Sequence, residues 1–88
     1  MKSFETLLKS ANKQLNADNW EAALITAEEA VEAGTDDAQW DSALFIKAEA
    51  LYCLDRAEKE ALPLYRKLKK SELLGDSEIK VCKSRIKE

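Results

Sequence analysis

The sequence contains no histidine and, in 88 residues, only two cysteines, two glycines and one proline. Without histidine there is no imidazole to act as a general base near neutral pH or to bind a metal. Cys53 and Cys82 are too far apart to form the closely spaced thiol pair of a zinc site. Gly34 and Gly75 stand far apart, which excludes a glycine-rich phosphate loop. We therefore expect no enzyme activity, no cofactor and no metal.

Patterns of strands and of membrane spans are also missing. The β-branched residues are scattered and never alternate with polar residues as they would in a strand. The longest apolar run is far shorter than the roughly 20 residues that cross a bilayer. The N-terminal residues also lack the apolar stretch of a secretory signal. We therefore expect a single, soluble, cytoplasmic domain. We expect Cys53 and Cys82 to be buried thiols, and the sequence leaves a redox role for these two cysteines open.

Charge is unevenly distributed along the chain. Residues 1–58 hold 5 basic and 12 acidic residues, whereas residues 59–88 hold 9 basic and 5 acidic ones. The basic end suits an acidic partner, or it balances the acidic part within the molecule. Nucleic acid is a poor candidate partner because the net charge is −3 and no aromatic residues interleave with the lysines of the last segment.

Good helix formers dominate the composition, and apolar residues recur with helical spacing in five segments. Short connections between these segments favour antiparallel packing of consecutive helices. The third segment is apolar on several sides, so we expect it in the middle of the assembly. The five expected helices run from Ser3 to about Asn16, from Asp18 to Gly34, from Ala38 to Leu54, from Asp55 to near Gly75, and from Asp76 to 87.

Several residues predict where these helices begin and end. Ser3 is expected to cap the first helix, and Asp76 or Ser77 the last. The pairs Asp18–Glu21 and Asp55–Glu58 have the spacing of a capping box at the start of the second and fourth helices. Gly34 is expected to close the second helix in the left-handed conformation. Trp20 and Trp40, at helix starts on apolar faces, are expected to pack in the core.

An internal repeat relates the first two expected helices to the next two. Ala11 precedes the pair Ala23-Leu24 by 12 residues, and Ala48 precedes Ala61-Leu62 by 13. Alanine at such positions lets two helices approach closely. The segment from Ala48 to Leu62 resembles a tetratricopeptide repeat across its inner turn, and the resemblance covers residues 4–74. The two units repeat at 37–38 residues, longer than the roughly 34 of that family, and they lack its closing proline.

The resemblance implies an all-α fold of two antiparallel helix hairpins, residues 3–34 and 37–74, and a C-terminal capping helix, residues 76–87. An antiparallel bundle that shares only the alanine-rich seams is the alternative. In tetratricopeptide arrays the first helix of each hairpin lines a concave groove that holds a peptide or helix of a partner. The resemblance therefore implies an adaptor or scaffold that binds another protein.

The candidate partner-binding residues occupy the positions that would line this groove. Phe45 and Tyr52 supply its apolar part, unless Phe45 is buried under the last helix. The candidates are Glu5, Leu8 and Asn12 on the first helix, Ser42, Phe45, Glu49 and Tyr52 on the third, and Lys80 and Lys83 on the last.

Two further interpretations follow from the same pattern. Two hairpins leave exposed end faces, so a self-associating structural or assembly protein, such as a homodimer, is the alternative function. Asn12-Lys13 resembles part of the carboxylate clamp of chaperone adaptors. However, Leu8, Ser42 and Ile46 stand where that clamp needs basic residues, so we do not expect clamp activity.

Overall fold

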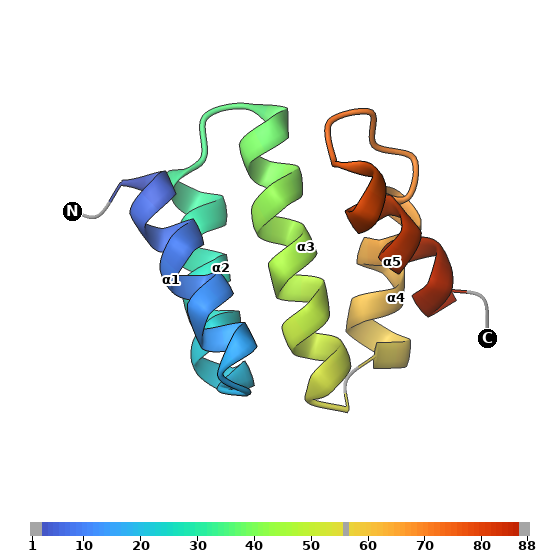
Figure 1. Cartoon of the computed structure of the whole chain (residues 1–88), viewed down its shortest axis with the longest axis horizontal. Coiled ribbons are helices and arrows are strands. Elements are labelled where there is room, and N and C mark those ends of the chain that lie inside the picture. The colour runs from blue at the N-terminus through green and yellow to red at the C-terminus, as the bar shows by residue number, and fades with distance from the viewer. Residues whose placement is uncertain (1–2, 56, 87–88) are drawn as a thin grey trace.

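The chain is all-helical in the computed structural model, which describes residues 3–55 and 57–86, with the side chains of residues 57 and 58 excepted. No strand occurs among these residues (Figure 1). The expected end of the last helix at residue 87 lies outside the described range. The elements are α1 (Phe4–Asn16), α2 (Trp20–Ala33), α3 (Asp37–Cys53), the π-helical turn η1 (Ala57–Ala61), α4 (Leu62–Leu68) and α5 (Asp76–Ile86).

Side chains satisfy backbone N–H groups at the start of three helices. The Ser3 hydroxyl accepts a hydrogen bond from the N–H of Thr6 at 3.3 Å, which confirms the predicted cap of α1. At the start of α3, a carboxylate oxygen of Asp36 accepts from the N–H of Gln39 at 2.9 Å. The start of α5 differs from the prediction: Gly75 precedes the helix, and its N–H donates to Glu78 Oε1 at 3.1 Å.

The predicted capping role of Asp18 is wrong. Asn19 occupies the cap position of α2 and makes no side-chain hydrogen bond there. Asp18 instead has a φ of 62°, and the N–H groups of Asp18 and Asn19 donate to the carbonyls of Leu15 and Gln14. This is a Schellman motif, which satisfies the last carbonyls of α1 and needs one left-handed residue. Asp18 therefore ends α1 rather than starting α2.

Asp55 occupies the same position after α3, with a φ of 66°. Its N–H donates to the carbonyl of Tyr52 at 3.4 Å. The expected partner side chain, Glu58, lies outside the described side chains. Aspartate tolerates the left-handed conformation better than most residues, so the aspartate at each of these turns suits the end of the preceding helix.

Gly34 and Trp40 also differ from the prediction. Gly34 is extended, with φ −70° and ψ 147°, rather than left-handed. The Trp40 indole Nε1 donates to the Gly34 carbonyl at 3.2 Å, and a Cβ on Gly34 would lie 2.8 Å from Trp40 Cδ1. Trp40 is 39% exposed, so it is not a core residue, whereas Trp20 is half-buried. Gly34 therefore makes room for the indole.

α4 ends at Leu68, well before the predicted end near Gly75. Residues 69–75 form a loop that Ser71 fastens to α3. Its hydroxyl donates to Asp41 Oδ2 at 2.6 Å and accepts from the N–H of Leu73 at 3.0 Å. Leu74 turns back into the core with 9% of its surface exposed. The hydrogen bond between Ser71 and Asp41, which are 30 positions apart, therefore holds a loop where the sequence predicts the last turns of a helix.

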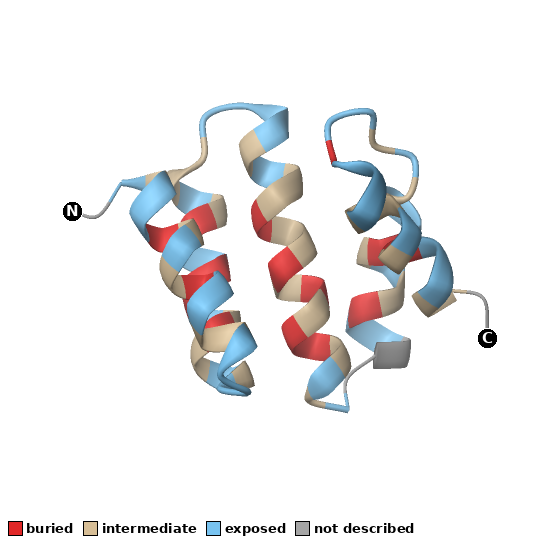
Figure 2. Ribbon diagram, viewed as in Figure 1, coloured by how far each residue is buried: buried red, intermediate tan, exposed pale blue. Residues whose placement is uncertain are grey.

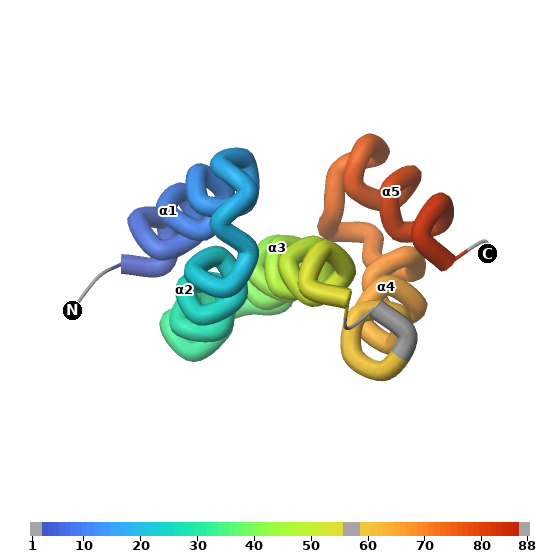
Figure 3. The backbone as a smooth tube through the Cα atoms, turned by 90° about the horizontal axis from the view of Figure 1, so that it is seen from below, coloured from blue at the N-terminus to red at the C-terminus, as the bar shows by residue number. Residues whose placement is uncertain are grey.

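The helices run up and down beside one another, with α3 in the middle (Figure 1). Consecutive helices pack together, and α1 also contacts α3. Seen along the helices, α1 and α5 lie on the same side of the row formed by α2, α3 and α4, with α3 between them (Figure 3). The long dimension of the molecule, 39 Å, runs across the helices from the first hairpin to α4 and α5 (Figures 1 and 3).

Alanine fills the contacts between the helices. Ala11, Ala27 and Ile46 meet where α1, α2 and α3 come together, and both alanines are fully buried. α3 is buried or half-buried at every position from Asp41 to Tyr52, as expected for a central helix (Figure 2). The largest cluster lies between α3, α4 and α5 and consists of Ala48, Leu51, Ala61, Tyr65, Leu68, Leu74 and Cys82.

Candidate functional site

The predicted stripe on α3 is neither fully exposed nor fully buried. Ser42, Phe45, Glu49 and Tyr52 are all half-buried. Phe45 and Tyr52 pack against the cluster between α3, α4 and α5. Phe45 therefore contributes one side to the core while part of its surface stays accessible to solvent.

Glu49 is the centre of a polar network that joins three helices. The Tyr65 hydroxyl of α4 donates to Glu49 Oε1 at 2.5 Å. Arg85 of α5 donates from Nε to Oε1 and from Nη2 to Oε2, both at 3.3 Å. The Arg85 guanidinium lies 4.3 Å from the centre of the Tyr52 ring, which packs edge-on against Tyr65 at 6.2 Å. Glu49 and Tyr52 therefore hold α5 in place.

Tyr65 and Arg85 of this network each keep one ionisation state around neutral pH. Burial, followed by the hydrogen bond to Glu49, raises the pKa of Tyr65 well above its usual range. The hydrogen bonds to Glu49 raise the pKa of Arg85 as well. Tyr65 therefore stays a neutral donor and Arg85 a cation. The network is suited to holding helices together rather than to transferring protons.

The three predicted residues on α1 are brought together. Glu5, Leu8 and Asn12 line one shallow pocket together with Ser3, Thr6 and Lys9. Glu5 and Asn12 are exposed, whereas Leu8 is half-buried and packs against core residues below. This pocket is polar at its edges and apolar at Leu8.

The two predicted lysines on α5 are placed differently. Lys80 and Lys83 are exposed, and at 100° per residue Lys80 lies on the side of α5 opposite the buried Cys82. Arg85, which the sequence presented only as one of a run of basic residues, is the α5 side chain that reaches the α3 stripe. Opposite charges at Glu49 and Arg85 were the only signal for this contact, and 36 residues separate them.

The two cysteines have different environments, so the prediction of two buried thiols is wrong for Cys53. Cys53, at the end of α3, is exposed, whereas Cys82 is fully buried. Burial, followed by the charges of Glu49 and Glu78, raises the pKa of Cys82 to about 11. Burial and then Glu49 also raise the pKa of Cys53. Both thiols are therefore protonated near neutral pH, and neither has the depressed pKa of a reactive cysteine.

This difference predicts selective labelling. At pH 7.5 a small alkylating reagent should modify Cys53, while native Cys82 should react about a hundredfold more slowly because it must first become exposed. Intact mass spectrometry over time measures both rates, and Cys53→Ser isolates the second thiol. Equal rates at the two cysteines in the folded chain would contradict the placement of α5 over α3 and α4.

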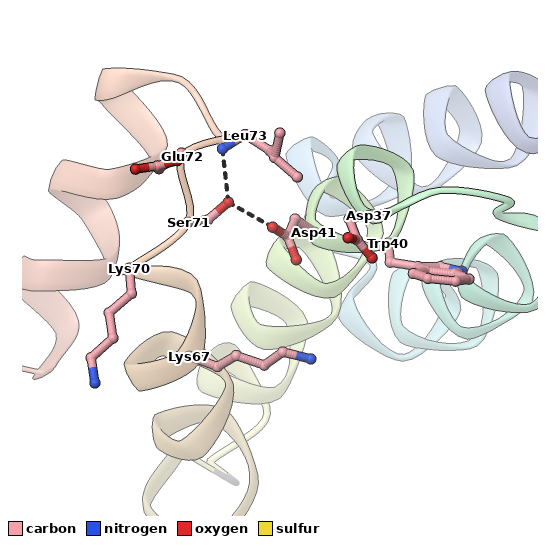
Figure 4. Close-up of a pocket in the computed structure, with 8 residues that line it drawn as sticks. All are labelled: Asp37, Trp40, Asp41, Lys67, Lys70, Ser71, Glu72 and Leu73. Carbon is pink, nitrogen blue, oxygen red and sulfur yellow. Dashed lines mark hydrogen bonds between the residues drawn. The ribbon is translucent and has the colours of Figure 1, made fainter.

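A second hollow lies between the start of α3, α4 and the loop 69–75 (Figure 4). Trp40 and Leu73 form its apolar part and are 39% and 53% exposed. Its walls carry both signs of charge. The sequence did not predict this hollow because residues 69–75 were assigned to a helix. The lining residues are Asp37, Trp40, Asp41, Lys67, Lys70, Ser71, Glu72 and Leu73.

Within the described residues, no group of three or more histidine, cysteine or carboxylate side chains is placed to hold a metal. No helix in that part of the chain has the length and apolarity needed to span a membrane. No family model, curated protein or solved structure matches this chain.

Proposed function

We propose that the protein is an interaction module that holds a peptide or helix of a partner protein on the face of α3 between α1 and α5. The observation that carries this proposal is the partial exposure of two apolar side chains, Leu8 on α1, which shares a pocket with the exposed polar residues Glu5 and Asn12, and Phe45 on α3. Accessible apolar surface with a polar rim is typical of protein-binding sites. The resemblance to tetratricopeptide repeats supports the same face.

The network around Glu49 supports a preformed site. Through their hydrogen bonds to Glu49, Arg85 holds α5 against α3 and Tyr65 holds α4 against α3. Because α5 is fixed in this way, a partner does not have to order it on binding. A binding surface that is ordered in advance loses less conformational entropy when a partner binds.

A selection from a displayed library of helical and extended peptides tests this function. Ser42 is half-buried on the α3 stripe, so Ser42→Arg should obstruct the face without removing a core side chain. We expect selected peptides to bind this variant at least about tenfold more weakly. Ser84→Arg, at an exposed position of α5, is the matched control and should bind normally. Peptides that bind both variants as well as the parent chain would refute the proposal.

A further inference from the structure

α2 and the η1–α4 segment are structurally equivalent at a spacing of 38 residues. Three pairs of positions at this spacing are fully buried in both segments: Ala23 and Ala61, Ala27 and Tyr65, and Ala30 and Leu68. The two segments therefore present the same face to the interior. Their outward faces can then be compared position by position.

The outward faces carry opposite charge at every equivalent charged position. On α2 these positions are glutamates, whereas on η1–α4 and at Lys70, in the loop that follows α4, they are lysine or arginine. All eight side chains are exposed. A fifth pair, Ile25 and Pro63, is exposed at the centre of each face. The charged pairs are Glu21 and Lys59, Glu28 and Arg66, Glu29 and Lys67, and Glu32 and Lys70.

We call Glu21, Ile25, Glu28, Glu29 and Glu32 the acidic face, and Lys59, Pro63, Arg66, Lys67 and Lys70 the basic face. α2 and the η1–α4 segment, which carry these faces apart from Lys70, lie on the side of the molecule away from α1 and α5 (Figure 3). Glu28 also pairs with Lys47 at 3.4 Å, but 52% of its side chain stays exposed. Ile25 is 60% exposed, the highest value among the large apolar residues that the structure describes.

From this inversion we infer that a second copy of the chain docks on these faces, the acidic face of each copy against the basic face of the other. The two faces match in spacing, are opposite in sign and are apolar at the centre. These features favour the chain itself over an acidic protein or a nucleic acid, either of which would use the basic face alone.

A two-fold axis parallel to the helices produces this arrangement. α2 and α4 both run upward in Figure 1, so this rotation sets α2 of one copy beside α4 of the other in the same direction. The acidic face of each copy then lies against the basic face of the other at matching heights along the helices, and at the centre Ile25 faces Pro63. The interface is isologous, so both faces of each copy are covered and assembly stops at two.

Sedimentation velocity over a range of concentrations tests the inference. The parent chain should form dimers at low ionic strength and dissociate as salt is added, because exposed charge pairs are screened. The double reversal Glu29→Lys with Glu32→Lys should weaken dimerisation at least about tenfold, and so should Lys67→Glu with Lys70→Glu. Circular dichroism checks that each variant stays folded.

Mixing these two variants gives the sharpest result. In the mixture the two lysines introduced on one variant meet the two glutamates introduced on the other, and the unchanged faces meet as in the parent, so an equimolar mixture should recover the dimer. Lys80→Glu with Lys83→Glu, exposed on α5, is the matched control and should dimerise like the parent. Ser42→Arg should also dimerise normally, which separates this inference from the proposed function.

Three outcomes would overturn the inference. The parent chain could stay monomeric at low salt, the mixture could fail to associate, or assembly could continue beyond two copies. A chain that stays monomeric but binds a single-stranded RNA through Lys67 and Lys70 would assign the basic face to nucleic acid instead.

Discussion

Tyr65→Ala is expected to lower the free energy of unfolding by about 3–5 kcal/mol, a large part of the stability of a domain of this size. Among the side chains that the structure describes, Tyr65 is the largest that is fully buried. Its ring fills the cluster between α3, α4 and α5, and its hydroxyl donates to Glu49. Truncation leaves a cavity and also removes the hydrogen bond that joins α4 to Glu49 of α3. Urea denaturation followed by circular dichroism measures the loss.

A milder substitution and its control distinguish the contribution of the Tyr65 ring to stability from that of its hydroxyl. Tyr65→Phe keeps the packing and removes the hydrogen bond to Glu49, so it should cost about 1.5–3 kcal/mol. Tyr52→Phe is the matched control, because no hydrogen bond of the Tyr52 hydroxyl occurs among the described residues, and it should cost little. Similar costs for the two variants would show that the Glu49 network does not stabilise the fold.

Ala27→Leu is expected to cost about 1–3 kcal/mol or more through overpacking. Ala27 is fully buried and meets Ala11 and Ile46 where α1, α2 and α3 come together. A larger side chain has no space there unless the helices separate. Thermal unfolding measures the effect.

Ala38→Leu provides the comparison for this substitution. Ala38 is exposed in the first turn of α3, so the added side chain extends into solvent and stability should change by no more than about 0.5 kcal/mol. If Ala27→Leu proved as stable as Ala38→Leu, the seam would be loosely packed and alanine would not be needed there.

The sequence predicted the features of the fold that depend on local signals. Ser3 begins α1 because its hydroxyl can reach a backbone N–H three residues later within the same turn. The apolar spacing on α1 and α2 matches the buried positions Leu7, Ala11, Ala23 and Ala27. The surplus of apolar residues on α3 correctly predicted a central helix.

Features that depend on contacts between distant residues were not predictable in this way. The end of α4 depends on Ser71 reaching Asp41, and the conformation of Gly34 depends on the position of the Trp40 indole. The two aspartates after α1 and α3 were misassigned because a cap before one helix and a left-handed residue after another use the same residue types.

In the candidate site, too, the features set by local spacing were predictable and those set by contacts between distant residues were not. Helical spacing placed Glu5, Leu8 and Asn12 in one pocket on α1. It could not show that Glu49 and Tyr52 bind Arg85 within the molecule, since that contact depends on how α5 packs. Nor could it show that Cys53 is exposed at the end of α3 while Cys82 is buried.

The central claim is that partners bind on the face of α3 between α1 and α5. Nuclear magnetic resonance tests it most directly, by titrating the ¹⁵N-labelled chain with the tightest peptide from the selection. The largest amide shifts should fall on residues near Leu8, Asn12, Ser42 and Phe45. Shifts centred instead on the outward faces of α2 and α4, with this stripe unchanged, would contradict the claim.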